Sequence, residues 1–442
     1  MAKRRYRERR AKLPVGYAVE ADPAKSVEHI RLLSANLSDW LGDWLRSGNV
    51  CYLKRLSGND TLANQSHQAG PYIPKELLFR VLPKINDRSL RNPDCEFDAY
   101  VDSHNDHRRV RAIWYNNRLF GGSRDEARVT GWGGMASALL DPDATGSLAV
   151  FIFVQVAADP ATQLRVWVCR NPSEEELIED RIAPVEPGRP LVFDPSAEQL
   201  GLFAVTRATA PESSCRLTAE ELPPSWLNDF PPAIEIVRKV CELRPASGLS
   251  ADERLVRRRN CEFELFQSVE EAIEGRQINR RFLSVADFLS HAQRILQRRK
   301  ARSGRSLELQ TRAILLEDGF VEGKDFSHQP ESDTGKRPDF LFPSEVAYKD
   351  ASFPENRLRM LATKTTCKDR WRQVINEADR ISEKHLLTLQ EGVSVNQHAE
   401  MRAAGVRLVV PKGLVSSYPE QVRPELLQLD SFFEEVRRLS NP

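Results

Sequence analysis

The sequence has no long hydrophobic segment, no marked excess of charge of either sign and no paired cysteine motif. Its longest mostly apolar run, residues 148–157, is shorter than the roughly 20 residues that a membrane-spanning helix needs, so no membrane partner is expected. No apolar segment follows the basic N-terminus, which argues against a secretory signal peptide. The net charge is +1 over 442 residues, so any binding of nucleic acid would depend on local basic patches.

The cysteines are scattered along the chain. There are seven of them, an odd number, and no two form a CxxC pair. This pattern predicts reduced thiols in a cytoplasmic protein, and neither a disulfide framework nor a zinc site.

Changes in composition divide the sequence into four regions. Residues 1–45 begin with a basic arm, which is either a solvated tail or an arm that binds along the DNA phosphates without sequence preference, and continue as a helical extension. Residues 46–208 are rich in predicted strands and indicate a β-barrel-like domain. Residues 209–224 contain prolines and serines typical of a linker. Residues 225–442 begin with helices and continue as mixed α/β structure. The helices expected in this last region are 225–245, 249–274, 281–300 and 305–318.

Three charged residues occur in an order used by metal-dependent nucleases. Asp339 begins the short apolar run 339–342, which predicts a strand, and Lys364 lies at the end of a second predicted strand, 358–365. Glu377 follows thirteen residues after the lysine. Two adjacent strands and a packed helix could bring these side chains to one point.

The residue types suit the hydrolysis of a phosphodiester bond. Carboxylates hold Mg²⁺, a hard cation that prefers oxygen ligands and lowers the pKa of a bound water. A lysine beside the phosphate can orient that water and stabilise developing negative charge. Glu377 is expected inside a helix spanning about 369–385. The alternative is a set of surface ion pairs, because acids and lysines are common in this chain.

The sequence around these residues resembles the EcoRII family of restriction endonucleases. This resemblance implies an N-terminal DNA-binding β-pseudobarrel domain and a C-terminal restriction-endonuclease-like α/β/α domain. It also implies a homodimeric Type II enzyme that uses Mg²⁺ and cuts double-stranded DNA at CCWGG or a similar site. In the family, a second DNA copy bound to the N-terminal domain activates cleavage, and a cytosine methyltransferase protects host DNA. The segments that carry the resemblance are 52–57, 70–74, 111–113, 304–309, 336–344, 364–373, 376–379 and 405–411.

The resemblance assigns further catalytic residues. It places Glu308 and Tyr348 near the active site, although a buried or capping glutamate and a supporting tyrosine are the alternatives. Asp339 and Glu377 would hold the metal. In the family variant matched here, the second acid has moved from the lysine strand to the next helix, which accounts for Ala362 two residues before the lysine.

Two groups in the second domain match DNA-recognition positions of the family. Lys368, Asp369 and Arg370 would read C:G pairs, since arginine can pair with guanine and an acid can accept from cytosine. The alternative is that these three residues only form the charged N-terminus of a helix. Arg259 and Phe263 are four residues apart and would share a helix face. They would hold an extruded base between them, unless Phe263 belongs to the core and Arg259 binds a phosphate.

The first domain carries the expected contacts to effector DNA. Alternation along a strand would put Arg124, Glu126 and Arg128 on one face, where the arginines could pair with guanine and the glutamate with cytosine. The sequence departs from the family at Gly122 and Ala127, where basic residues are expected, and this weakens the expected phosphate contacts. The matched positions are His67, Tyr72, Arg124, Glu126 and Arg128.

Two rival functions remain open. One is a DNA-binding regulator with a decayed nuclease domain, which the intact acid, lysine and acid argue against. The other is a repair or modified-DNA nuclease of the same fold, which the Lys368-Asp369-Arg370 triplet argues against.

Overall fold

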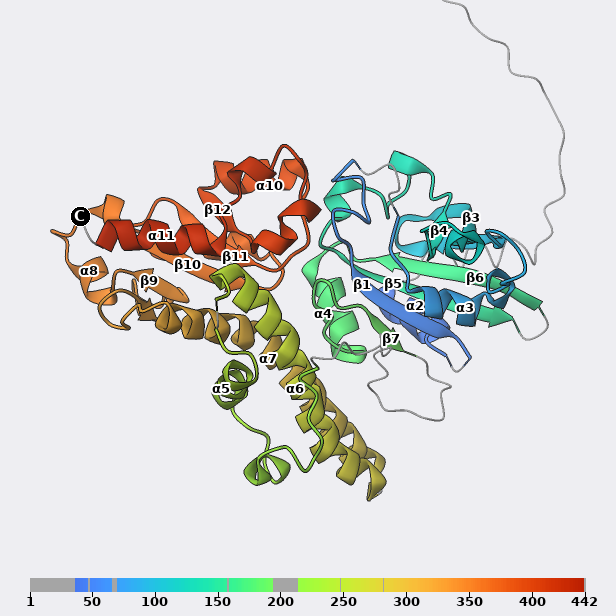
Figure 1. Cartoon of the computed structure of the whole chain (residues 1–442), viewed down its shortest axis with the longest axis horizontal. Coiled ribbons are helices and arrows are strands. Elements are labelled where there is room, and N and C mark those ends of the chain that lie inside the picture. The colour runs from blue at the N-terminus through green and yellow to red at the C-terminus, as the bar shows by residue number, and fades with distance from the viewer. Residues whose placement is uncertain are drawn as a thin grey trace, which may run out of the picture.

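The chain forms a strand-rich first domain and a mixed α/β second domain that lie side by side (Figure 1). The basic arm, His67 and the first part of the predicted linker, residues 209–213, fall outside the described residues. No helix in the described part is long and apolar enough to cross a membrane. The computed structural model describes residues 36–46, 48–65, 70–156, 159–193, 214–246, 248–280 and 282–440.

The first domain is a curled seven-stranded sheet, which confirms the predicted β-pseudobarrel. The strand order is β4-β3-β2-β6-β5-β1-β7, and only the β2–β6 pairing is parallel. The apolar run that stands out in the sequence forms β5 and supplies buried side chains to both faces of the sheet. The elements are α2 (Leu37–Trp44), β1 (Val50–Arg55), α3 (Lys75–Val81), β2 (Asp94–Val101), β3 (Asp106–Tyr115), β4 (Glu126–Thr130), β5 (Leu148–Val156), β6 (Asp159–Val168), α4 (Pro172–Arg181) and β7 (Leu191–Phe193).

The second domain is built on a five-stranded sheet in the order β12-β11-β10-β9-β8. Strands β10, β11 and β12 are parallel, whereas β8 and β9 are antiparallel to their neighbours. The elements are α5 (Ala233–Leu243), α6 (Ala251–Asn279), α7 (Val285–Glu317), β8 (Ser327–His328), β9 (Phe340–Phe342), α8 (Glu345–Lys349), β10 (Arg359–Lys364), α9 (Trp371–Val374), β11 (Lys384–Thr388), α10 (Val395–Ala403), β12 (Val406–Val409) and α11 (Leu429–Ser440).

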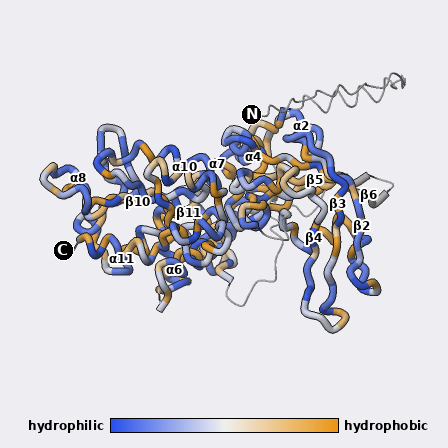
Figure 2. Tube along the Cα trace, turned by 90° about the horizontal axis from the view of Figure 1, so that it is seen from above, coloured by the Kyte–Doolittle hydropathy of each residue, from blue (hydrophilic) through white to orange (hydrophobic). Residues whose placement is uncertain are grey.

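Helices cover both faces of this second sheet, as expected for an α/β/α domain. On one face, buried residues of α6, α7 and α11 pack against Phe340, Leu361 and Leu387. On the other, Met360 and Leu386 pack against buried residues of α9, α10 and the C-terminal loops. Figure 2 shows the hydropathy of the chain along both domains, viewed from above. The sheet thus presents the ends of β9 and β10 between two apolar layers.

Helix α7 is one continuous element of 33 residues, so the prediction of two helices, 281–300 and 305–318, was wrong. Gly304 lies in its interior, where glycine costs about 1 kcal/mol relative to alanine. Buried residues on both sides of the glycine, including Arg302 and Leu307, hold the helix against the body. The unbroken helix carries Glu308 to the edge of the sheet.

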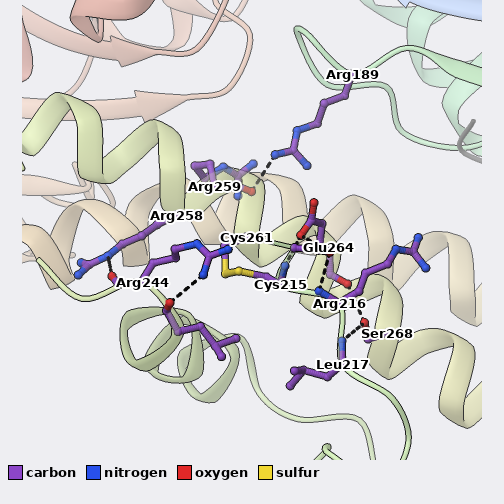
Figure 3. Close-up of a disulfide and its surroundings, with 12 residues drawn as sticks. Arg189, Cys215, Arg216, Leu217, Arg244, Arg258, Arg259, Cys261, Glu264 and Ser268 are labelled. Carbon is purple, nitrogen blue, oxygen red and sulfur yellow. Dashed lines mark hydrogen bonds between the residues drawn. A yellow bond between two sulfur atoms is a disulfide. The ribbon is translucent and has the colours of Figure 1, made fainter. Parts of the chain in front are cut away.

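Cys215 and Cys261 form a disulfide, which contradicts the prediction of reduced thiols only. The two cysteines are 46 residues apart, and local spacing cannot show that the chain after the linker returns along α6. Two hydrogen bonds also hold this segment against α6: the amide of Cys215 donates to Glu264, and the amide of Leu217 donates to the Ser268 hydroxyl (Figure 3). The other cysteines in the described residues are free.

Reduction of the disulfide is expected to destabilise the protein. Closing a loop of 46 residues restricts the unfolded chain and contributes about 2–4 kcal/mol. The urea midpoint should therefore fall when a reductant is added, and Cys215→Ser should show the lower midpoint in either condition. Cys241→Ser, at a free cysteine, should keep the response to reductant. Equal midpoints with and without reductant in the wild type would contradict the bond's role.

Candidate active site

The predicted strands bring Asp339 and Lys364 to the same edge of the second sheet. Asp339 comes immediately before β9, and Lys364 ends β10, to which β9 is paired with Phe340 opposite Leu361. Asp339 Oδ2 accepts hydrogen bonds from the amide (2.6 Å) and the hydroxyl (2.9 Å) of Thr363. These two donors fix the carboxylate and leave Oδ1 directed to other partners.

Glu377 reaches the same place without the predicted helix. Helix α9 ends at Val374, and Glu377 lies in a bend before β11. The helix expected over 369–385 was therefore wrong. The chain must turn here because β11 starts at Lys384, whose buried ammonium donates to the carbonyl of Ala378 at 2.7 Å. Long-range pairing of the apolar β11 with β10 overrides the local helical pattern.

The three groups influence one another electrostatically. Burial raises the pKa of Glu377 to about 7, Lys364 lowers it, and Asp339 raises it. Burial also raises the pKa of Asp339, again opposed by Lys364. A cation bound between the two partly desolvated carboxylates would favour their charged forms and so oppose the effect of burial on both pKa values.

The two carboxylates fit a hydrated divalent cation. Glu377 Oε2 is buried and has no hydrogen-bond partner among the described residues, and such an atom normally has one. No group of three or more histidine, cysteine or acidic ligands occurs in the described part of the chain. The protein would therefore supply Asp339 and Glu377 and leave the remaining positions to water, as Mg²⁺ often requires.

Metal binding is expected to depend on pH through Glu377. The carboxyl must be deprotonated to bind a cation, and in the metal-free protein its pKa is raised to about 7. Affinity should therefore be fully developed above pH 7 and be lost as the pH falls. Between pH 8 and pH 6 the apparent affinity for Mn²⁺ should decrease roughly tenfold, since one proton competes. Calorimetric titrations can measure this, and Glu377→Gln should remove the pH dependence. A flat profile in the wild type would exclude Glu377 as a ligand.

Glu308 lies in the same cavity as Asp339 and Lys364, whereas Tyr348 does not. Asp339, Lys364 and Glu308 line one cavity of about 490 Å³. Tyr348 is buried outside the lining, and its hydroxyl donates to Asp333 Oδ2 (2.9 Å) and accepts from the amide of Arg380 (3.2 Å). Burial raises the pKa of Tyr348 to about 12. This position suits a residue that supports the loop after Glu377.

The predicted base-reading triplet borders the cavity. Asp369 and Arg370 line it, and they lie in a turn before α9. The amide of Lys368 donates to Gln390 Oε1 at 3.0 Å, and its ammonium donates to the hydroxyl of Ser147 in the first domain. One of the three candidate side chains is thus held by the first domain.

Arg259 and Phe263 are also covered by the first domain. Arg259 is 3% exposed, and its guanidinium pairs with Glu186 (3.1 Å) and Glu262 (3.0 Å). The guanidinium of Arg189 lies 4.3 Å from the centre of the Phe263 ring. Arg189 also donates to the carbonyl of Arg259 at 2.8 Å (Figure 3). The Arg259 guanidinium and the Phe263 ring, which were expected to hold a base between them, are therefore already in contact with Glu186 and Arg189 of the first domain.

Sequence reasoning missed this charged cluster. Glu186 also pairs with Arg302 of α7 at 2.7 Å, and Arg302 in turn contacts Glu262 at 2.8 Å. Burial alone would raise the pKa of Glu186, but Arg302, Arg259 and Arg189 together lower it. No local pattern marks Glu186 and Arg189, because their partners lie 70 or more residues away in α6 and more than 100 away in α7.

The residues predicted to contact effector DNA form a separate group in the first domain. Tyr72, Arg124 and Arg128 line a cavity of about 480 Å³. Glu126 accepts from Arg124 at 2.5 Å and from Arg128 at 2.9 Å, so the three predicted contacts are adjacent. Ala127 is 2% exposed and belongs to the core, hence a phosphate contact from that position would require a different backbone.

Comparisons with known proteins agree with these two domains. Residues 46–198 match the family described as restriction endonuclease EcoRII, N-terminal, and residues 266–433 match EcoRII C terminal. The Type II restriction enzyme EcoRII of Escherichia coli is 40% identical over 410 residues, which cover 92% of this chain and 99% of that protein.

Solved structures give weaker matches. A metal-depleted Ecl18kI in complex with uncleaved DNA is 20% identical, with a TM-score of 0.40 over 50% of this chain and 85% of that chain. The UbaLAI restriction endonuclease B3 domain with cognate DNA is 21% identical, with a TM-score of 0.25 over 35% and 97% of the two chains. The two family matches and the 40% identity along nearly the whole relative carry the assignment: the chain belongs to the EcoRII family of restriction endonucleases.

Proposed function

We propose that this protein is a Mg²⁺-dependent Type II restriction endonuclease that hydrolyses both strands of double-stranded DNA at CCWGG or a similar short site. The observation that carries the proposal is the proximity of Asp339, Lys364 and Glu377, which come from separate segments: Lys364 lowers the pKa of both acids, and Asp339 raises the pKa of Glu377. Surface ion pairs would not leave a buried carboxylate oxygen of Glu377 without a partner.

The residues divide the chemistry between them. Asp339 and Glu377 would hold the cation, which supplies an activated water and neutralises charge on the phosphate. Thr363 keeps the Asp339 carboxylate in place. Lys364 orients the attacking water and stabilises the negative charge that develops on the phosphate oxygens. Glu308 lies beside them in the same cavity.

Recognition would use residues on either side of this cavity. Lys368, Asp369 and Arg370 would read C:G pairs from the major groove. Arg259 and Phe263 would hold an extruded base by stacking. Residues of both groups contact the first domain, and these contacts support the proposal of a closed form from which duplex DNA would be excluded.

The first domain would regulate access by binding a second copy of the site. Tyr72, Arg124, Glu126 and Arg128 support that role by their shared surface, and His67 belongs to the same proposal by resemblance. Regulation requires that effector DNA bind the open form better than the closed form. The active species would be a homodimer, and a cytosine methyltransferase would protect host DNA.

Digestion of plasmid DNA tests the proposal. Unmethylated plasmid should give discrete fragments with Mg²⁺, and their ends should map to CCWGG or a related site. Plasmid methylated at that cytosine should resist. Specific binding without cleavage would favour the rival regulator with a decayed nuclease domain, and cleavage restricted to methylated or damaged DNA would favour the rival repair nuclease.

A further inference from the structure

We propose that His328 is a positioning residue that holds the Glu308 carboxylate in the catalytic cavity. The inference rests on the proposed function, because it assigns a task within the same site. His328 does not line the cavity, whereas Glu308 does. His328 therefore acts through the glutamate and not on the DNA.

The location of His328 is fixed by strand pairing. It belongs to β8 and lies opposite Phe340 of β9, the residue after Asp339. Its ring stacks against the Phe340 ring at an interplanar angle of 29°, with centroids 5.4 Å apart. Its side chain is 12% exposed. The imidazole consequently has one orientation, and its Nε2 atom points toward α7.

The contact with Glu308 is short and shielded from solvent. Nε2 of His328 lies 2.5 Å from Oε1 of Glu308, and Glu308 is 5% exposed. A carboxylate accepts hydrogen bonds, so Nε2 is the donor. Arg305 approaches from the other side, at 3.1 Å from Oε1 and 3.3 Å from Oε2. The stronger contact on Oε1 leaves Oε2 the freer oxygen to face the cavity.

The position of Glu308 matters to the acids that would bind the metal. Glu308 is close enough to Asp339 to raise the pKa of that carboxyl. A glutamate that turned away would change the negative field that attracts the cation. Removing the imidazole would leave the buried Oε1 with only its longer contact to Arg305, and this loss of a hydrogen bond favours such a turn. His328 thus supports the site in the way that outer hydrogen-bond partners support metal ligands.

The test compares His328→Leu, which removes the donor, with His328→Gln, whose amide can replace it. His328→Leu should lower kcat about 10–100-fold with little change in KM, and His328→Gln should retain most of the activity. Affinity for Mn²⁺, measured by calorimetry without DNA, should fall several-fold in His328→Leu. His398→Leu, at a buried histidine of α10, should leave both quantities unchanged.

A double-mutant cycle with Glu308→Gln separates positioning from packing against Phe340. If His328 acts through Glu308, adding His328→Leu to Glu308→Gln should cause no further loss of kcat or Mn²⁺ affinity. Full additivity of the two losses, or wild-type behaviour of His328→Leu, would overturn the proposal. If the wild type cleaves no DNA, the proposed function fails, and the Mn²⁺ cycle alone still decides whether His328 positions Glu308.

Discussion

Lys364→Ala is expected to lower the single-turnover rate of DNA cleavage about 10²–10³-fold while specific DNA binding persists. The ammonium stabilises charge that develops only in the transition state, and loss of one such donor costs about 2.7–4 kcal/mol. Lys364 lowers the pKa values of both Asp339 and Glu377, so its charge acts directly at the carboxylates. Rapid-quench cleavage of a duplex with one site, in the presence of an added cognate effector duplex, would measure the rate.

Lys412→Ala is the matched control, because it removes an exposed lysine of the same domain outside the cavity. Its rate should equal that of the wild type. Binding of both variants to cognate and non-cognate duplexes, measured with Ca²⁺ in place of Mg²⁺, should also match the wild type. A cleavage rate within threefold of wild type in Lys364→Ala would remove the lysine from the proposed mechanism.

Glu186→Gln is expected to activate cleavage of DNA that carries a single site. In the closed form, Glu186 is the carboxylate that the first domain places between Arg259 and Arg302. Loss of its charge leaves buried arginines poorly compensated, which costs about 3–5 kcal/mol for a broken buried pair. The open form, in which those arginines meet water or DNA, is not penalised. Since 1.4 kcal/mol corresponds to a factor of ten, this cost corresponds to an activation of roughly 100- to 4,000-fold.

The measurement is the ratio of cleavage rates with and without an added cognate oligonucleotide duplex. This ratio should be large in the wild type and close to one in Glu186→Gln, and Arg189→Ala should shift it in the same direction. Asp180→Asn is the control, because Asp180 joins the domains through an exposed pair with Lys300, and exposed pairs contribute at most about 1 kcal/mol. An unchanged ratio in Glu186→Gln would show that other contacts keep the enzyme closed.

Local sequence patterns predicted the elements that carry the chemistry. The apolar runs before and around Asp339 and Lys364 predicted β9 and β10, because alternating or continuous apolar residues between turns are typical of strands. The same holds for β5 and β6 in the first domain. These elements depend on short segments whose hydrophobic faces must be buried, whatever the rest of the chain does.

Other features depended on contacts between distant segments. The bend at Glu377 replaces a predicted helix because β11 must pair with β10. The disulfide joins residues 46 apart, and Glu186 finds its arginines in helices of another domain. His328 had no distinguishing sequence signal, since a single histidine gains its role only from the neighbour that folding places beside it.

The sequence by itself determined the two-domain class, the family and the acid, lysine and acid of the proposed catalytic set, because residue type and order along the chain specify these. Only the tertiary structure decided which groups touch. It united Glu308 with Asp339 in one cavity, placed Tyr348 outside it, and closed the first domain over Arg259 and Phe263. The physical reason is that burial and ion pairing act through space, so their partners are unrelated to distance along the chain.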